Sequence, residues 1–439
     1  MKSVFKLSSS RLALLTAFGL TAAAYTPAVA ADLGGDCCAD LEERVAELEA
    51  TTARKGNRKV SLTVSGWVNE SLMVWDDGTE SNAYVGTNTL EQSRFRFVGE
   101  AQIAPGYSAG YTMEIGVQGE PLNGFTQAGP GTGSSNNVLT VRKSNWWLKS
   151  KDLGKVTVGL EGTALYHILD DADGANTRNF SDAQAAGAYN PNFFLRHDGG
   201  GVNGLKWSSI LQGIDNGTVG QDGRRNIVRY DSPTIAGFVL TASWGEDDDW
   251  GMALTYSNKW GDFLVLGKVG YGRNSDENIG CSEKGIANQS ATDCELFGTA
   301  ATIMHVPTGL YVYGGYAQNH DNLVADTAPG ADATSSLWFV QGGIEQKWLP
   351  LGKTTIFGEY RHDDGGSKLH ANVTTTAGDF LHSTSLNFVG AGVVQHIDPA
   401  EMDLYVVYRH AGGDIKGTVT GDTSLDAFDA VIMGGLIRF

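Results

Sequence analysis

The feature that most constrains this chain is an alternation of apolar and polar residues with a period of two. It begins near Val60 and continues to Phe439. In the stretch 94–103, RFRFVGEAQI, Phe95 and Phe97 alternate with Arg94 and Arg96. A β-strand has this period because successive side chains point to opposite faces. After the first thirty residues no apolar run reaches the roughly 18 residues of a transmembrane helix, so a helical membrane protein is excluded.

Turn-forming residues divide the alternating region into sixteen predicted strands. Seven of the connections are tight turns, and most of the others are longer and polar, which is typical of an antiparallel up-and-down barrel in an outer membrane. Several strands carry an aromatic residue near one end, as an aromatic girdle requires; these residues include Trp67, Trp250, Trp260, Trp338 and Trp348. The predicted strands are 60–75, 91–104, 106–118, 138–151, 155–161, 225–232, 237–245, 249–259, 262–273, 295–305, 310–319, 335–348, 352–361, 383–397, 402–410 and 428–439.

The last ten residues, AVIMGGLIRF, are expected to close this barrel. An open strand edge would leave backbone groups unsatisfied in hydrocarbon, so the strand that ends at Phe439 must pair with the strand that begins near Val60. An even number of strands places both ends of the chain on the periplasmic side. We therefore predict a 16-stranded antiparallel transmembrane β-barrel over residues 60–439, with Phe439 at the periplasmic interface.

Residues 1–30 have the pattern of a secretory signal peptide. Lys2, Lys6 and Arg11 precede an apolar stretch at 12–24, and Ala28 and Ala30 form a removable A-x-A end. The stretch is too short to be a comfortable membrane anchor. We expect export through the Sec pathway to the outer membrane and a mature chain that begins at Ala31.

Residues 31–59 are expected to lie in the periplasm and to include a short helix. Leu41, Val45 and Leu48 are spaced four and three residues apart and form one apolar stripe among acidic residues. A helix this short is only marginally stable by itself in water. The apolar stripe therefore favours a coiled coil between copies of the chain over a frayed acidic leader.

Charge and cysteine content exclude further classes. The formal net charge is −18, and an acidic exported chain lacks the basic face that nucleic acids require. Four cysteines are too few for a disulfide scaffold, although Cys281 and Cys294 could be linked within one polar stretch. The adjacent Cys37 and Cys38 could form a vicinal or intermolecular disulfide, or remain free.

Three segments resemble the porin family of alphaproteobacteria, and the resemblance extends over essentially the whole mature chain. They are DCCADLEERVAELEATTARKGNRKVSLTVSGWVNESLMVWDDG, SRFRFVGEAQI and the terminal GGLIRF. The resemblance implies a water-filled general diffusion pore with its third loop folded inward, assembled as a homotrimer in outer-membrane lipid and lipopolysaccharide. Small hydrophilic solutes and ions would pass through it.

One connector, residues 162–224, is far longer than the others and is the candidate constriction loop. Its acidic residues Asp170, Asp171 and Asp173 follow apolar residues that could pack inside the barrel. Opposed acidic and basic rows would create a transverse field across a narrow channel. The basic row is predicted to be Arg94, Arg96, Arg142 (or its neighbour Lys143), Arg361 and Arg409. An ordinary solvated loop is the alternative, and the acidic chain suggests weak cation preference.

Other functions are less well supported by the sequence. The histidines, such as His167 and His197, form no recognisable catalytic pair, so we expect no enzyme, cofactor or metal site. The acidic run 246–249 is either a solvated loop tip or a site for divalent cations beside lipopolysaccharide. The principal alternative function is a sugar-selective channel, because inward-facing aromatic residues would provide a stacking track; the candidates are Tyr311, Tyr313, Phe339 and Phe357.

Overall fold

The computed structural model of the protein describes residues 60–129, 138–181, 189–211, 219–246, 248–275, 293–323, 332–365, 381–417 and 421–439. The expected signal peptide, the periplasmic helix and the Cys37–Cys38 pair lie outside these residues. The barrel belongs to a compact unit, Thr51–Phe439. Among the described residues, no helix is long and apolar enough to cross a bilayer.

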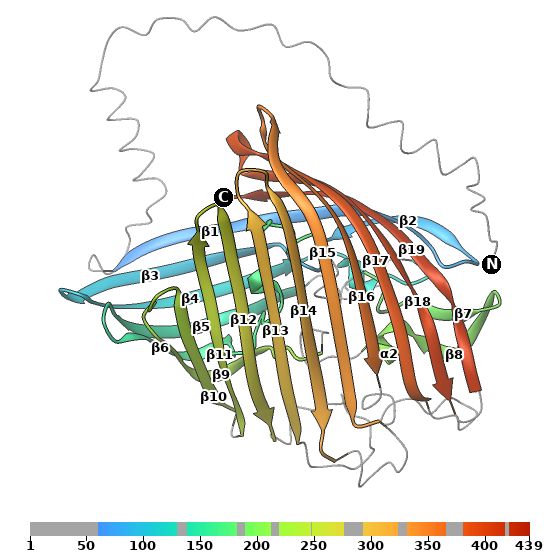
Figure 1. Cartoon of the computed structure of the whole chain (residues 1–439), viewed down its shortest axis with the longest axis horizontal. Helices are drawn as coiled ribbons and strands as arrows, with labels where there is room; N and C mark the ends of the chain where they lie inside the picture. The colour runs from blue at the N-terminus through green and yellow to red at the C-terminus, as the bar shows by residue number, and fades with distance from the viewer. Residues whose placement is uncertain are drawn as a thin grey trace, which may run out of the picture. The chain divides into compact units, whose positions relative to one another are not determined.

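Sixteen antiparallel strands close into a β-barrel (Figure 1). A further strand, β2 (Ser81–Thr87), pairs with residues 70–76 of β1. β3 pairs with residues 61–67 of the same strand. The wall consists of β1 (Ser61–Asp76), β3 (Arg94–Ala104), β4 (Tyr107–Gln118), β5 (Val138–Ser150), β6 (Gly154–Gly162), β9 (Arg224–Asp231), β10 (Phe238–Gly245), β11 (Asp249–Trp260), β12 (Phe263–Asn274), β13 (Cys294–His305), β14 (Leu310–Asp321), β15 (Thr334–Leu349), β16 (Gly352–Gly365), β17 (Leu381–Ile397), β18 (Met402–Gly417) and β19 (Gly421–Arg438).

The two ends of the barrel chain meet as the sequence predicts. β19 pairs antiparallel with β1, from Trp67 opposite Arg438 to Asp76 opposite Asp429. Beyond the strand, Gly66 and Phe439 exchange two backbone hydrogen bonds of 2.9 and 3.0 Å. No barrel edge is therefore left open at this seam, which satisfies the backbone groups that hydrocarbon could not.

The outer surface carries the apolar side chains that the alternation places there. Exposed large apolar residues lie on strands all around the wall, and they include the predicted girdle residues Trp250, Trp260, Trp338 and Trp348. Trp67 differs, because it stands under the guanidinium groups of Arg94 and Arg96 inside the barrel. Its position in the inward phase of β1 decides this, since a strand exposes every second residue to lipid.

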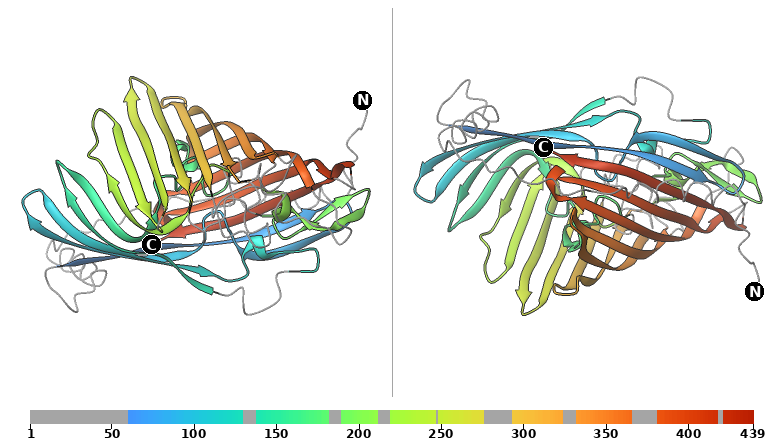
Figure 2. Two further views of the ribbon diagram at one scale, coloured as in Figure 1. Left: turned by 90° about the horizontal axis from the view of Figure 1, so that it is seen from below. Right: turned by 90° about the horizontal axis from the view of Figure 1, so that it is seen from above.

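The connector between β6 and β9 folds into the barrel, as predicted. Its described parts contain η2 (Asp170–Ala172), the hairpin β7 (Phe194–His197) and β8 (Gly200–Lys206), and the short helix α2 (Trp207–Ile210). The two views in Figure 2 show green segments of this connector within the ring of strands. The remaining short helices are η1 (Leu122–Gly124), which follows β4, and η3 (Asp398–Ala400), in the turn before β18.

Apolar side chains attach the connector to the inner face of the wall. Its fully buried residues, among them Leu165, Ile168 and Phe180, join one cluster with inward-facing side chains of the wall. Glycines of the wall make room for them: a Cβ on Gly251 would meet Leu165, and one on Gly270 or Gly298 would meet Ile168. Because each buried large apolar side chain contributes roughly 1.5–3 kcal/mol, this packing fixes the first part of the loop against β11–β14. Phe180 packs on Tyr405 of β18 instead.

Two further details bear on the sequence predictions. β19 begins at Gly421, seven residues before the predicted start, and pairs there with the outer part of β18. Cys294, at the start of β13, is buried and disulfide-bonded, while its predicted partner, Cys281, lies outside the described residues.

Candidate functional site

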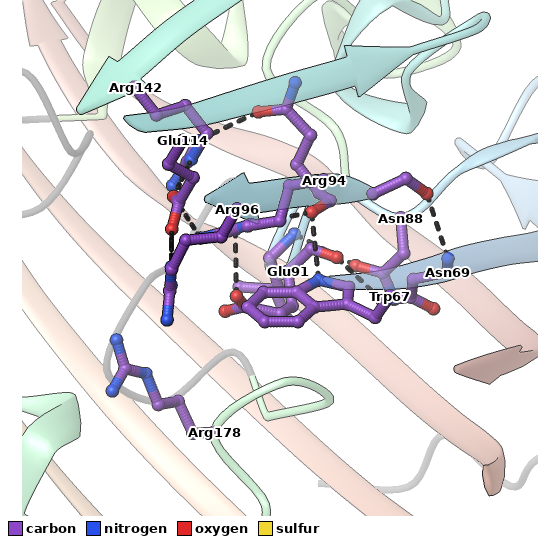
Figure 3. A network of polar contacts seen from close by, with 12 residues as sticks. Trp67, Asn69, Asn88, Glu91, Arg94, Arg96, Glu114, Arg142 and Arg178 are labelled. Carbon is purple, nitrogen blue, oxygen red and sulfur yellow. Dashed lines mark hydrogen bonds and ion pairs between the residues drawn. The ribbon is translucent and has the colours of Figure 1, made fainter. Parts of the chain in front are cut away.

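A buried carboxylate on the wall gathers three arginines. Glu114 of β4 is 1% exposed and contacts Arg94 at 3.1 Å, Arg142 at 2.9 Å and the Nε of Arg96 at 2.7 Å. Alternation places Arg94 and Arg96 on the same face of β3, and the antiparallel register sets Arg96 opposite Glu114. Figure 3 shows these side chains converging above Trp67. Three residues of the basic row expected from the sequence therefore lie together on the wall.

The segment just before β3 also binds the arginines of this cluster. Glu91 contacts Arg94 at 2.8 Å, and the side-chain oxygen of Gln92 accepts a hydrogen bond from Arg142 at 2.9 Å. Trp67 donates from its indole nitrogen to the Gln92 carbonyl and lies 4.5 Å from the Arg94 guanidinium. A cation above an aromatic face is attracted by the ring quadrupole, so Trp67 holds Arg94 in place without neutralising it.

A β-bulge in β5 turns two consecutive basic residues toward the lumen. The register with β4 jumps so that Glu114 faces Lys143 while Ile115 faces Val141, which leaves Arg142 as the extra residue. Arg142 reaches Glu114, and Lys143 forms an ion pair of 2.6 Å with Glu161 of β6. Bulges commonly redirect side chains in this way. The sequence offered Arg142 and Lys143 as alternatives, whereas the fold uses both.

On the loop, two of the predicted aspartates are paired with basic side chains. Asp170 accepts hydrogen bonds from His167 at 2.7 Å and from Arg178 at 3.0 Å. Asp171 lies between Arg178 at 2.9 Å and Lys268 of β12 at 2.7 Å. Burial raises the pKa of the Asp170 carboxyl, but Arg178 and His167 lower it by more, so the pKa is below its usual range. Burial lowers the pKa of His167, which is therefore neutral at pH 7.

Arg178 is the loop side chain that faces the wall. Partial burial lowers the pKa of its guanidinium, but the carboxylates of Asp170, Asp171 and Glu91 raise it above the ordinary value. Since Glu91 lies in the segment before β3, the loop is attracted to that segment. Figure 3 shows the guanidinium groups of Arg178 and Arg96 pointing toward one another.

Asp173 does not serve as the predicted constriction residue. Its Oδ1 accepts from the backbone N–H of Ala175, and its Oδ2 accepts from those of Thr177 and Arg178. Burial raises the pKa of this carboxyl, although the backbone bonds lower it in part. Asp173 thus holds a turn of the loop, because short polar side chains readily cap the backbone groups that follow them.

Arg361 and Arg409 lie in the inward phase of β16 and β18, but both are buried, so they do not line the open channel. Arg361 is 1% exposed and forms an ion pair with Asp363. Arg409 contacts Glu359 at 2.6 Å and donates to the carbonyl of Phe180 in the loop. The loop therefore contributes to the burial of Arg409, whereas the partners of Arg361 named here belong to the wall.

Several functional residues were not predicted from the sequence. These residues do not belong to a charge pattern that the sequence makes visible, and they pair with segments far apart in the chain. They are Glu91, Gln92, Arg178, Lys268 and Arg224. Glu114 could have been found, because it occupies the polar phase of strand 107–118, opposite the arginines. Arg224 adds another positive charge, with its guanidinium 5.8 Å from the Tyr166 ring.

The arrangement suits transport of solutes better than chemistry on them. Charged side chains of wall and loop face each other, and Arg96 and Arg178 are 33% and 31% exposed. Such rows bias the passage of ions through a water-filled pore. Among the described residues, no three His, Cys, Asp or Glu side chains are grouped so that they could hold a metal ion. Of the acidic run 246–249, Asp249 is buried beside Arg225, and residue 247 lies outside the described ones.

Comparisons with known proteins agree with this reading of the fold. Solved structures with the same fold include the anion-selective porin from Comamonas acidovorans, with a TM-score of 0.55 and 14% identity over 87% of this chain and 100% of that one. In-vitro folded OmpT, an outer membrane protein of Vibrio cholerae, has a TM-score of 0.52 and 13% identity over 88% of this chain and 99% of its own. Salmonella typhi OmpF in complex with daunomycin has a TM-score of 0.51 and 14% identity over 88% of this chain and 99% of its own.

No curated protein sequence matches the chain. The family model described as Gram-negative porin matches residues 13–425, which is nearly the whole chain. This protein therefore belongs to the Gram-negative porin family.

Proposed function

We propose that the protein is a passive channel for small hydrophilic solutes and ions across the outer membrane. The observation that supports this most is the asymmetric filling of the barrel. The loop packs with apolar side chains against β11–β14 and also against β1 and β17–β19, while charged side chains of β3 and β5, such as Arg96 and Lys143, stay partly exposed. A passage lined by charge on one side and by the loop on the other holds water and needs no moving part.

The buried state of four aromatic residues favours general diffusion over a sugar-selective channel. Tyr311, Tyr313, Phe339 and Phe357 face inward, but each is less than 5% exposed beneath the loop. Tyr313 also donates its hydroxyl to the Leu169 carbonyl at 2.7 Å. Side chains in this position offer no surface on which a sugar could stack.

A homotrimer in outer-membrane lipid and lipopolysaccharide is part of this proposal. Its support is the apolar stripe of Leu41, Val45 and Leu48, which a single short helix cannot bury. The signal peptide at 1–30, the periplasmic segment at 31–59 and the narrower alphaproteobacterial relationship remain predictions from the sequence. No enzymatic role is proposed, because the charged site has no nucleophile beside a base.

Conductance and liposome swelling test the proposal together. The purified protein should give discrete steps in a planar bilayer, with conductance nearly proportional to potassium chloride concentration. Liposomes that contain it should swell in neutral sugars at rates that fall with solute size and do not depend on sugar type. Saturation of the current by an oligosaccharide would favour the sugar-selective channel, and the absence of any steps would refute channel function.

A further inference from the structure

The wall of the constriction carries more positive than negative charge. Arg94, Arg96, Arg142 and Arg224 lie close enough to interact electrostatically, and Arg142 repels both Arg94 and Arg224. Among the described residues, Glu91, Glu114 and Glu161 oppose these four arginines and the neighbouring Lys143. An Nη atom of Arg224 is buried without a hydrogen-bond partner among the described residues. The wall therefore holds an excess of two positive charges, although the whole chain is acidic.

The loop does not cancel this excess. Asp170 and Asp171 are matched there by Arg178 and Lys268, and His167 is neutral at pH 7 because burial lowers its pKa. Asp173 is occupied by the backbone of its own turn. When the carboxylate of Asp173 is counted, residues 165–178 together with Lys268 carry one net negative charge, which is less than the excess on the wall, and the loop presents a guanidinium to the wall.

Two guanidinium groups consequently border the channel from opposite sides. The Nε and Nη2 atoms of Arg96 both bind one oxygen of Glu114, and its Nη1 has no hydrogen-bond partner within the described parts of the chain. Arg178 uses its Nε and Nη1 on Asp170 and Asp171 and is still 31% exposed. Figure 3 shows both groups pointing into the same space. Planar guanidinium forks match carboxylate and phosphate oxygens, which accept two hydrogen bonds at once.

We propose that Arg96 and Arg178 form a binding subsite for small oxyanions, such as phosphate, sulfate and carboxylates, and that the channel prefers anions. This inference rests on the proposed channel function and reverses the weak cation preference expected from the acidic chain. Net charge is a poor guide here because charges more than about 8–10 Å from the ion are screened by salt, whereas those of the constriction lie within that distance.

The sign of selectivity is tested by the reversal potential in a potassium chloride gradient. The wild-type channel should favour chloride, and Arg96→Gln or Arg178→Gln should each lower the chloride-to-potassium permeability ratio roughly two- to fivefold, as expected for one nearby charge in water. Arg273→Gln is the matched control. It removes an arginine paired with Asp293 at the outer end of β12, on the face that carries Tyr271 and points away from the lumen, and should leave the ratio unchanged.

The subsite itself is tested by adding inorganic phosphate or sulfate to a chloride solution. Either ion should reduce the chloride current in a saturable manner, and Arg96→Lys should keep the chloride preference but weaken this block, since an ammonium lacks the planar fork. A channel with clear steps but cation preference, or with no block by either oxyanion, would overturn the inference while leaving channel function intact. So would arginine variants that behave like Arg273→Gln. Heat-modifiable migration of each variant shows that its barrel is folded, and the two arginines lie on separate segments, so one misfolded variant does not decide the result.

Discussion

At the scale of single residues, Glu114 explains how three arginines can share one part of the wall. Guanidinium groups repel one another when nothing lies between them, and Glu114 gives each a charged partner while being itself almost fully buried. Removing one member of a buried charge network is costly because it leaves the others unpaired. The carboxylate is therefore a positioning residue, and Arg96 is the most exposed of the three arginines that it holds.

The two loop aspartates 171 and 173 should behave differently when neutralised. Asp171 is 38% exposed and touches Arg178 and Lys268, so Asp171→Asn should shift the reversal potential toward anions. Asp173→Asn should leave the reversal potential unchanged but lower the thermal unfolding temperature, because it weakens a turn held by three backbone N–H groups. The expected loss is about 1–3 kcal/mol. Equal shifts of reversal potential in both variants would mean that Asp173 also faces the channel.

At the scale of elements, the alternation of apolar and polar residues was enough to predict the strands of the barrel. It did not predict how the loop inside the barrel folds. Every wall strand has one face toward lipid and one toward the lumen, so all sixteen appear in the sequence. β2, β7 and β8 were missed because they are short hairpin strands in polar segments. The β-bulge at Arg142 adds one residue to the strand, so the alternation of inward and outward side chains shifts there. A prediction from strict alternation misses this shift. Arg361 and Arg409 were placed on the correct face, but whether they are covered depends on the three-dimensional path of the loop.

The hairpin of β7 and β8 is attached to the outer rim by an arginine. Arg196 contacts Asp77 at 2.9 Å and Glu80 at 2.6 Å, both in the turn between β1 and β2. Arg196→Gln should speed amide hydrogen exchange at 194–206 by roughly fivefold or less, because partly exposed ion pairs contribute about 1 kcal/mol or less. The unfolding temperature of the barrel should not change. Arg273→Gln, which removes a comparable pair elsewhere on the rim, is the control.

The same attachment should depend on pH in one direction. Burial raises the pKa of Asp77, but its hydrogen bonds to Gln127, Glu80 and Arg196 lower it by more, so the folded pKa lies below the unfolded one. The stabilisation is therefore present above the unfolded pKa of about 3.9 and is lost as the pH falls through the folded pKa. Exchange protection, corrected for intrinsic rates, should be flat from pH 8 to pH 5 and fall only in stronger acid. A decline that begins already near neutral pH would contradict the assignment to Asp77.

Closure of the barrel by β19 gives a prediction about its last residue. Phe439 makes two backbone hydrogen bonds with Gly66, and its ring lies where a side chain on residue 66 would be. Deleting Phe439, or changing Gly66→Val, should reduce the yield of heat-modifiable barrels, because the seam would lose its last pair or be forced apart. Ile437→Ala, which trims an exposed side chain of the same strand, is the control and should assemble normally. Full yields for both variants would show that the seam closes without this pair.

At the scale of the whole molecule, local and total charge have opposite signs. The chain carries −18, yet the wall of the constriction carries an excess of arginine. The acidic residues outside the channel act on ions only through fields that salt screens. Selectivity therefore has to be inferred from the narrowest part of the pore, where the sequence gives the residues but not their partners.

Assembly is the remaining property of the whole molecule, and its test lies in the segment before the barrel. Replacing Leu41, Val45 and Leu48 by Asp should lower the temperature at which the trimer dissociates, because a coiled coil cannot bury charged side chains in its seam. The barrel should remain folded, since residues 51–439 form a compact unit of their own. Aspartate at 43, 47 and 51, on the polar face of the same predicted helix, is the control. If both triple variants dissociate at the wild-type temperature, the stripe does not join the subunits, and contacts between barrel walls must hold the trimer instead.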